Sequence, residues 1–111
     1  MQALGLLDST GLEVAVTELD IRVPDGSGDA EAAQQKLDYQ NAVGACMALT
    51  SCVGVSVWGV SDSTSWIPDV FPGEGAALLF DDALNKKPAY EGAIAGIGGA
   101  AVKRSRVFKS L

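Results

Sequence analysis

The stretch EVAVTELDIR, residues 13–22, places an apolar run directly before two acidic side chains. The run VAV is typical of a strand buried on both faces, as in a parallel sheet that helices cover. Such a strand does not normally end in Glu18 and Asp20 unless these carboxylates have a partner or a task, because burying an unpaired charge is costly. The two acids are two positions apart, so an extended backbone carries them on one face. The stretch therefore predicts a buried strand over residues 13–20 with an acid site at its carboxyl end.

A second valine-rich run, CVGVSVWGV at residues 52–60, predicts another strand that is buried on both faces. Between the two strands we expect a helix that Asp29 caps, that carries Glu31 in its first turn and that extends to about Leu49. The residues of this helix that share the stripe suited to packing on a sheet are Ala32, Tyr39, Val43, Cys46 and Met47. Because a crossover helix joins strands that run in the same direction, the two strands are predicted to be parallel.

Turns and two further helices are expected around this unit. The segment PDGSG, residues 24–28, has strong turn chemistry, and residues 59–75 are predicted to form a long loop. We expect one helix over residues 2–8 and another over about residues 87–97, with Pro88 in its first turn. The order helix, strand, helix, strand, helix indicates the α/β class. Two parallel strands cannot make a closed sheet, so we expect the chain to be part of a larger fold.

Composition limits the classes of protein to which the chain can belong. It has 111 residues, of which 48% are hydrophobic, which is enough for one small folded domain. The net charge is −6 with all acids between Asp8 and Glu91, so the body of the chain would repel nucleic acid. No apolar run is long enough to span a membrane, and the start MQALGLLDST lacks the basic region of a signal peptide. Basic residues crowd residues 98–111, which we expect to form a flexible tail rather than a recognition patch.

The two cysteines, Cys46 and Cys52, admit more than one interpretation. A zinc site would need four ligands, and the chain contains no histidine. A thioredoxin-type redox pair would need the spacing C-x-x-C, which these residues do not have. What remains is either a disulfide that closes a short loop or two buried free thiols. A disulfide would add about 2–3 kcal/mol of stability through loop entropy and would indicate maturation in an oxidising compartment.

Three side chains would converge if the two strands are neighbours. In (β/α) barrels the chemistry lies at the carboxyl ends of the strands, where Glu18 ends the first strand and Trp58 the second. Trp66 lies in the loop beyond. Indole faces beside a carboxylate suit a sugar, because its ring stacks on indole while the acid addresses the anomeric carbon. Taken alone, each residue is more often a structural acid or a packing residue.

The sequence strings are more specific than this spacing. EVAVTELDIR, followed by CVGVSVWGVSDSTSWIPDVFPGEGAALLFDDALNKKPAY, closely resembles the C-terminal quarter of family 10 glycoside hydrolases, the endo-β-1,4-xylanases. The likeness extends from about Leu4 to Ile97, and ACMALTSCVG, with Cys46 and Cys52, resembles the disulfide segment of fungal members. The resemblance implies the C-terminal portion of a (β/α)8 TIM barrel, about strands seven and eight with their helices. Residues 1–97 would then be a partial catalytic domain.

The resemblance implies a role for each residue of the expected site. Glu18, in the T-E-L-D motif, falls on the family's catalytic nucleophile, which forms a glycosyl-enzyme intermediate in a retaining mechanism. Asp20 falls on the aspartate that supports a histidine on strand six, and that histidine hydrogen-bonds to the nucleophile. Trp58 and Trp66 match the aromatic residues around the sugar at the cleavage point. The resemblance implies no cofactor and no metal, a substrate that is xylan or a xylo-oligosaccharide, and a secreted protein.

The chain also departs from the family pattern. The family's acid/base glutamate follows an asparagine on strand four, whereas this chain contains no Asn-Glu pair and no histidine. A barrel of this class needs roughly 250 residues. We therefore expect a fragment that is inactive alone and whose missing partner is the N-terminal portion of the barrel. With only two strands, the side chains expected to be left exposed on the inward faces are Val14, Val16, Val55 and Val57.

Two functions of other classes stay open at this point. One is a non-catalytic carbohydrate-binding remnant that uses Trp58 and Trp66 without turnover. The other is a small standalone α/β protein with an acidic, cation-binding site at Glu18 and Asp20. Tight, stoichiometric metal binding would favour the second of these. Upstream sequence that carries the missing acid/base glutamate would favour the enzyme.

Overall fold

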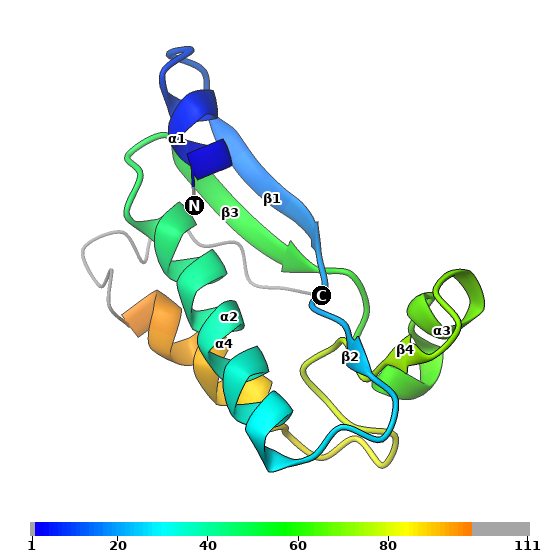
Figure 1. The fold of residues 1–111 in the computed structure, drawn as a ribbon. Helices are drawn as coiled ribbons and strands as arrows, with labels where there is room; N and C mark the ends of the chain where they lie inside the picture. The colour runs from blue at the N-terminus through cyan, green and yellow to red at the C-terminus, as the bar shows by residue number, and fades with distance from the viewer. Residues whose placement is uncertain (1, 99–111) are drawn as a thin grey trace.

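The computed structural model describes residues 2–98, and Figure 1 shows how they are arranged. The elements in chain order are α1 (Gln2–Asp8), β1 (Val14–Leu19), β2 (Val23–Pro24), α2 (Asp29–Met47), β3 (Cys52–Val57), η1 (Asp62–Thr64), α3 (Ile67–Val70), β4 (Glu74–Gly75) and α4 (Pro88–Gly98). The predicted order of the main helices and strands, and with it the α/β class, is confirmed. Within these residues no helix combines the length and the apolar character that a membrane span requires. Apart from Gly98, the predicted tail lies outside the described residues.

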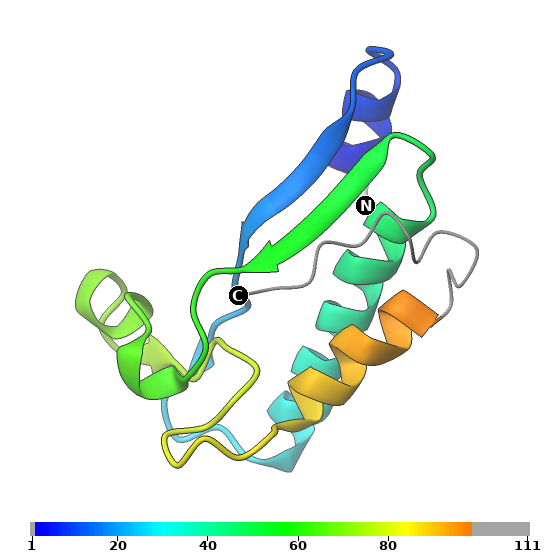
Figure 2. The ribbon, with the colours of Figure 1, turned by 180° about the vertical axis from the view of Figure 1, so that it is seen from behind.

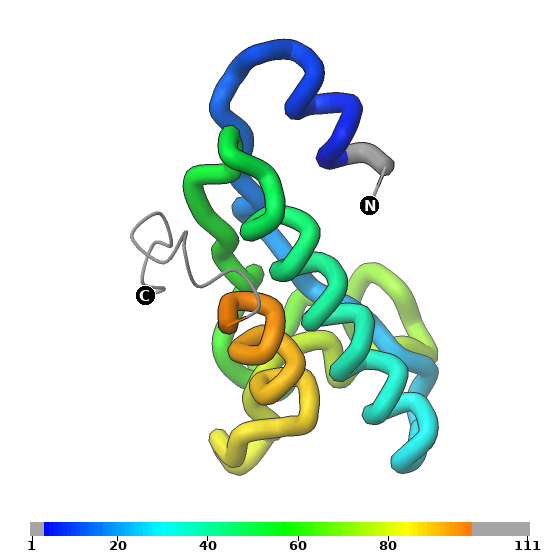
Figure 3. Tube along the Cα trace, turned by 90° about the vertical axis from the view of Figure 1, so that its left-hand side faces the viewer, coloured from blue at the N-terminus to red at the C-terminus, as the bar shows by residue number. Residues whose placement is uncertain are grey.

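The two long strands, β1 and β3, pair in parallel, as the crossover helix predicts. Val16 lies opposite Val55, and Leu19 lies opposite Val57. α2 packs on β3, and α4 lies along α2 (Figures 1 and 3). Figure 2 shows from behind that both helices lie on the same side of the two strands. The core therefore lies on this side of the sheet, where residues of α2 pack together with Ala89 and Ala93 of α4 and Leu4 of α1.

The prediction that both strands are buried on two faces is wrong for β1, whereas in β3 only Ser56 is exposed. In β1, Val14 and Val16 are half-buried, whereas Ala15 and Thr17 are exposed to solvent. Helices cover only one face of this two-stranded sheet, so the other face meets water. The prediction of four exposed valines is also wrong, because all four pack against the core; they are Val14, Val16, Val55 and Val57.

The start of α2 differs from the prediction by one residue. Gly28, and not Asp29, is the N-cap, and its N–H donates to Oε1 of Glu31 at 2.8 Å. Asp29 and Glu31 both lie in the first turn, where negative charge stabilises the helix dipole. The buried residues of α2 are Gln35, Tyr39, Ala42, Val43, Cys46 and Met47. The predicted stripe is thus confirmed in its main part, with a buried glutamine that the hydrophobic pattern did not indicate.

Two polar side chains of α2 hold the segment after β1 next to the segment that follows β4. Nε2 of Gln35 donates to the carbonyl oxygens of Ile21 and Ala76, in both cases at 2.7 Å. The hydroxyl of Tyr39 donates to the carbonyl oxygen of Ala77. β2 and β4 add a short antiparallel pair in the same region. Because these buried donors are satisfied, the two segments have a fixed place on α2.

The predicted long loop after β3 has internal structure. Within the predicted loop over residues 59–75 the structure contains η1, α3 and β4. Asp62 anchors this segment, because its carboxylate accepts from the N–H of Leu78 at 2.9 Å and pairs with Nζ of Lys87 at 2.8 Å. The side chains of Asp62 and Lys87 are only 11% and 13% exposed, so water screens their attraction less than at the surface.

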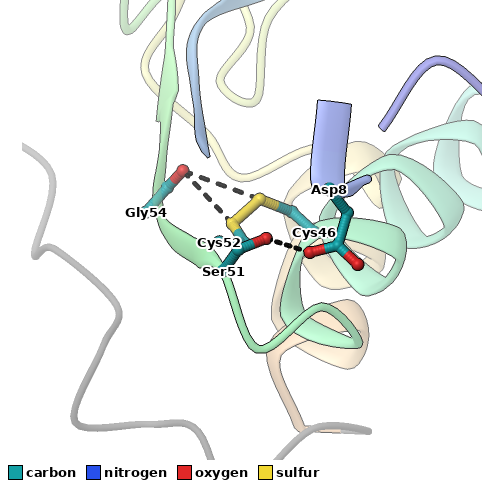
Figure 4. Close-up of a disulfide and its surroundings, with 5 residues drawn as sticks. All are labelled: Asp8, Cys46, Ser51, Cys52 and Gly54. Carbon is teal, nitrogen blue, oxygen red and sulfur yellow. Dashed lines mark hydrogen bonds between the residues drawn. A yellow bond between two sulfur atoms is a disulfide. The ribbon is translucent and has the colours of Figure 1, made fainter. Parts of the chain in front are cut away.

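A disulfide between Cys46 and Cys52 closes the connection from α2 to β3 (Figure 4), which resolves the choice between a bridge and free thiols. Their Cα atoms are 5.4 Å apart, within the ordinary range for a disulfide. The carbonyl oxygen of Gly54 lies near both sulfur atoms, and Oγ of Ser51 donates to the carboxylate of Asp8 at the end of α1. The bridge therefore ties the end of α2 to the strand on which that helix packs.

Candidate functional site

An irregularity in β1 turns Glu18 away from the core. The pairing of β1 with β3 changes register between Val16 and Leu19. Both of these residues pack against the core, although they are three positions apart and strict alternation would place them on opposite faces. Without the shift, alternation from Val16 would have directed Glu18 to the core. With it, Glu18 is exposed at the carboxyl end of the strand, as expected for a bulge that re-aims a side chain.

Trp58 follows β3 directly, beside the end of β1. Its N–H donates to the carbonyl oxygen of Leu19 at 2.8 Å, which extends the contact between the strands by one residue. Trp58 is 49% exposed, so it is not a core residue. Gly59 then turns the chain with φ of 124°, and a β-carbon there would lie 2.9 Å from Cδ1 of Leu78. This turn requires glycine, which fixes where Trp58 leaves the sheet.

Trp66 also lies at the carboxyl ends of β1 and β3. It is the first residue of the segment 66–73, which contains α3 and is called the α3 segment below. It is the N-cap of α3, and its indole Nε1–H donates to Oδ2 of Asp20 at 2.7 Å. Its ring also packs edge-to-face on Phe71, with 5.7 Å between the ring centroids. Trp66 is 40% exposed, so part of the residue remains open to solvent.

Four predicted site residues line one cavity of about 280 Å³, at the carboxyl ends of β1 and β3; they are Glu18, Asp20, Trp58 and Trp66. The structure thus brings together two carboxylates and two indoles that the sequence separates by up to 48 positions. Cys46 and Cys52 are not part of this cavity. The arrangement offers an exposed carboxylate beside two half-exposed aromatic faces, which suits an uncharged ligand with an apolar face and several hydroxyl groups.

The charges near the site act on one buried phenol. Burial raises the pKa of Tyr39 well above its ordinary value, and the negative charges of Asp20 and Asp62 raise it further. The backbone N–H of Ile21 acts in the opposite direction and is the smallest of these influences. Tyr39 therefore stays a neutral hydrogen-bond donor, which is the state that its bond to Ala77 needs.

A larger depression of about 450 Å³ lies elsewhere; it is lined by Asp25, Asp62, Pro68, Gly75, Ala76, Asp81, Asp82 and Ala83. Two of its carboxylates already have protein partners. Asp62 pairs with Lys87, and Asp81 accepts from the N–H groups of Asn85 and Ala83, of which the Asn85 contact is the main reason that the pKa of Asp81 is lowered. No aromatic side chain lines this depression. The smaller cavity at Glu18 is therefore the better candidate for a sugar.

The hypothesis of a cation site gains nothing from the structure. Within residues 2–98 no group of three or more His, Cys, Asp or Glu side chains is arranged to hold a metal. Glu18 and Asp20 supply only carboxylate oxygens, and one oxygen of Asp20 already accepts from Trp66. Hard cations such as Ca²⁺ need six or more oxygen ligands.

Comparison with known proteins shows the family. Residues 1–95 match Glycosyl hydrolase family 10. The chain belongs to this family. The sequence resemblance to it is confirmed over nearly the whole described part of the chain, and the match contains all four residues that line the cavity.

Curated relatives of this family 10 chain include fungal endo-1,4-beta-xylanases. It is 53% identical over 87 residues to "Endo-1,4-beta-xylanase 2" of Aureobasidium pullulans, which covers 78% of this chain and 24% of that protein. It is 50% identical over 88 residues to "Endo-1,4-beta-xylanase A" of Phanerodontia chrysosporium, over 79% of this chain and 22% of that protein. The chain thus spans about a quarter of the length of the curated relatives that it matches.

Solved family 10 structures show the same arrangement of elements. A glycosylated endo-β-1,4-xylanase from Gloeophyllum trabeum matches with a TM-score of 0.82 and 44% identity, over 86% of this chain and 30% of that one. A family 10 xylanase from Bispora, solved with xylobiose, matches with a TM-score of 0.81 and 38% identity over the same shares. The chain is therefore an α/β part that matches a portion of family 10 TIM-barrel structures.

Proposed function

We propose that this chain is part of a retaining endo-1,4-β-xylanase, in which Glu18 is the nucleophile. The observation that carries the proposal is the cavity at the carboxyl ends of β1 and β3, where Glu18 lies beside Trp58 and Trp66. A xylose ring has an apolar C–H face that stacks on indole, and an exposed carboxylate beside it reaches the anomeric carbon. The xylobiose bound to the Bispora relative supports this class of substrate.

The proposed mechanism uses Glu18 in two steps. Its carboxylate attacks the anomeric carbon as the glycosidic bond breaks, which leaves the sugar covalently attached to Glu18. Water then attacks the same carbon and releases Glu18. A second carboxyl group about 5–5.5 Å away must protonate the leaving oxygen and later activate the water. Among the described residues, one oxygen of Asp20 already accepts from Trp66, and Asp62 pairs with Lys87 and does not line the cavity.

The second carboxyl group would come from strands that this chain does not contain. We propose that β1 and β3 are strands seven and eight of the barrel and that residues 1–97 are part of its catalytic domain. The solvent-exposed face of the sheet, which carries Ala15, Thr17 and Ser56, would then face the barrel interior. Asp20 would support a histidine from the missing strand six. The Cys46–Cys52 bridge supports maturation in an oxidising, extracellular compartment.

A covalent label tests the proposal. The chain is joined to the remaining barrel strands of a related enzyme, treated with a 2-deoxy-2-fluoro xylobioside, and digested for peptide mapping. We expect the label on Glu18 and its loss in Glu18→Gln, while Glu13→Gln, which changes an exposed acid just before β1, keeps it. A label on any other residue contradicts the assignment.

The alternative is binding without turnover. The large exposed fractions of Trp58 and Trp66, 49% and 40%, favour it as the second candidate, because exposed indoles hold sugars without any acid. Titration of the 111-residue chain with xylobiose, followed by tryptophan emission, tests it. Saturable binding that Glu18→Gln leaves intact and Trp58→Ala removes would favour a carbohydrate-binding role for the isolated chain.

A further inference from the structure

The indole of Trp66 is held by side chains from the segment that follows β1, 46 positions earlier in the chain. Asp20 is the first residue after β1, and its Oδ2 accepts from Nε1 of Trp66 at 2.7 Å. A hydrogen bond to a carboxylate is about twice as strong as one between neutral groups. It also has a direction, so it fixes the rotation of the indole as well as its position.

Arg22 makes a second contact to the same segment. Its guanidinium carbon lies 3.9 Å from the centroid of the Phe71 ring, and Phe71 packs edge-to-face on Trp66. Arg22 also pairs with the carboxylate of Glu74 in β4. A guanidinium at this distance attracts the face of an aromatic ring. Arg22 therefore contacts the aromatic ring on which Trp66 packs.

The backbone between these contacts is also fixed. Val23 pairs with Gly75, and the N–H of Asp25 donates to the carbonyl oxygen of Gly73 at 2.8 Å. The α3 segment is thus attached at its far end by β2 and β4. At its near end, where Trp66 lies, the contacts to the segment after β1 among the described residues are made by side chains. Loss of these side-chain contacts would release the indole without unpairing the strands.

We propose that Asp20 and Arg22 are positioning residues that hold Trp66 at the cavity beside Glu18 before any sugar binds. An indole that is already fixed loses less rotamer freedom when a sugar ring stacks on it, so the entropy cost of sugar binding is lower. This consequence for sugar binding rests on the proposed function. The hold itself does not depend on catalysis. Asp20 would thus have two separate roles: it positions Trp66 within this chain, and it supports the histidine of the proposed strand six.

Trp66 fluorescence measures the hold directly and without sugar. Trp58→Phe in the 111-residue chain leaves Trp66 as the only tryptophan. In this background, time-resolved anisotropy reports the fraction of indole that moves freely on the nanosecond scale. We expect Asp20→Leu, which has a similar shape and no acceptor, to lower the ratio of held to released indole on the order of fivefold. Asp20→Asn keeps an oxygen acceptor and should recover most of the held fraction.

Two variants of Arg22 test whether its positive charge contributes to the positioning of Trp66. Arg22→Gln should also release part of the indole, and Arg22→Lys, which keeps a cation for the Phe71 ring, should release less. The matched control is Asp69→Asn in α3, since Asp69 is an exposed acid near Trp66 whose carboxylate has no partner among the described residues. Asp69→Asn should leave the anisotropy unchanged. The proposal is overturned if Asp20→Leu behaves like Asp69→Asn.

A measurement on the unmodified chain covers the case in which Asp20→Leu does not fold. The indole N–H of Trp66 should exchange with water at least several-fold more slowly than that of Trp58, which has no acceptor among the described residues. Equal exchange rates of the two indole N–H groups would overturn the proposal. Every one of these measurements is made without sugar. If they show that Asp20 and Arg22 do not position Trp66, the assignment of Glu18 as the nucleophile is not affected. If the covalent label is not found on Glu18, the positioning of Trp66 is not affected.

Discussion

The backbone of Gly92 in α4 lies directly on the backbone of Lys36 in α2: a β-carbon added to Gly92 would be 2.1 Å from the carbonyl oxygen of Lys36. One turn later, a β-carbon on Gly96 would be 2.7 Å from the carbonyl oxygen of Gln40. Real side-chain carbons do not come this close to backbone atoms. The two helices can lie against each other at this distance only because both positions are glycine.

Gly92→Ala should therefore destabilise the chain although alanine favours helices. The clash must be relieved by moving α4 away from α2, which costs about 1–3 kcal/mol or more, against a gain of about 1 kcal/mol in helix propensity. Urea unfolding followed by circular dichroism measures the difference.

Gly5→Ala in α1 is the matched control for this prediction. A β-carbon on Gly5 meets nothing within 4 Å, so alanine there should be neutral or slightly stabilising. If Gly92→Ala is as stable as Gly5→Ala, the close contact between α2 and α4 is not a feature of the folded chain.

The disulfide should carry a measurable share of the stability. Replacing Cys46 and Cys52 by alanine together should lower the free energy of unfolding by about 2–3 kcal/mol, because the short loop between them is no longer closed in the unfolded chain. Alkylation of the unfolded, unreduced protein followed by mass spectrometry checks the bridge first. Incorporation of two alkyl groups would mean free thiols and would remove the argument for an oxidising compartment.

Local patterns of apolar residues correctly predicted the long strands and the main helix of this fold. The apolar runs gave both parallel strands, and the stripe that contains Tyr39 gave the buried face of α2. The structure places Trp58 and Trp66 with Glu18, which strand ends and loop position had indicated. Valine-rich strands also predicted burial on two faces. That pattern reflects the larger fold in which such strands occur, so it overstates burial in a chain with helices on one face.

Local sequence patterns could not predict contacts between residues that are far apart in the sequence. β2 and β4 are two residues each, and Val23 pairs with Gly75 only because the α3 segment folds back on the chain. A single glutamine in an apolar stripe, Gln35, gives no local sign that its amide bonds to carbonyl oxygens of Ile21 and Ala76. The bond from Trp66 to Asp20 is of the same kind.

Tyr39 should make stability fall in alkaline solution. Burial, with the charges of Asp20 and Asp62, raises its pKa in the folded chain above the ordinary value of about 10. The folded state therefore keeps a proton that the unfolded state releases. The contribution of the neutral Tyr39 phenol to the free energy of unfolding is present in full below about pH 10. As the pH rises above this value, the free energy of unfolding falls by about 1.4 kcal/mol per pH unit.

Tyr39→Phe isolates this effect from other titrations. Its free energy of unfolding should lack the additional alkaline decline when both proteins are unfolded in urea between about pH 8 and pH 11. At neutral pH the variant should lose only about 1 kcal/mol, since the carbonyl oxygen of Ala77 still accepts from the N–H of Ile21 at 3.1 Å. Parallel curves for the two proteins would contradict the raised pKa.

The 111-residue chain by itself should not hydrolyse xylan. Retaining hydrolysis needs two carboxyl groups that face each other across the scissile bond, and in the described residues Glu18 has no such partner. Asp20 directly follows the strand that carries Glu18 and accepts from Trp66, while Asp62 is bound to Lys87. Asp69 lies exposed on α3 and does not line the cavity. Reducing-sugar release from xylan should therefore stay at the level of Glu18→Gln. Release that Glu18→Gln abolishes would contradict the prediction, and it would mean that copies of the chain assemble so that a carboxyl group of one faces Glu18 of another.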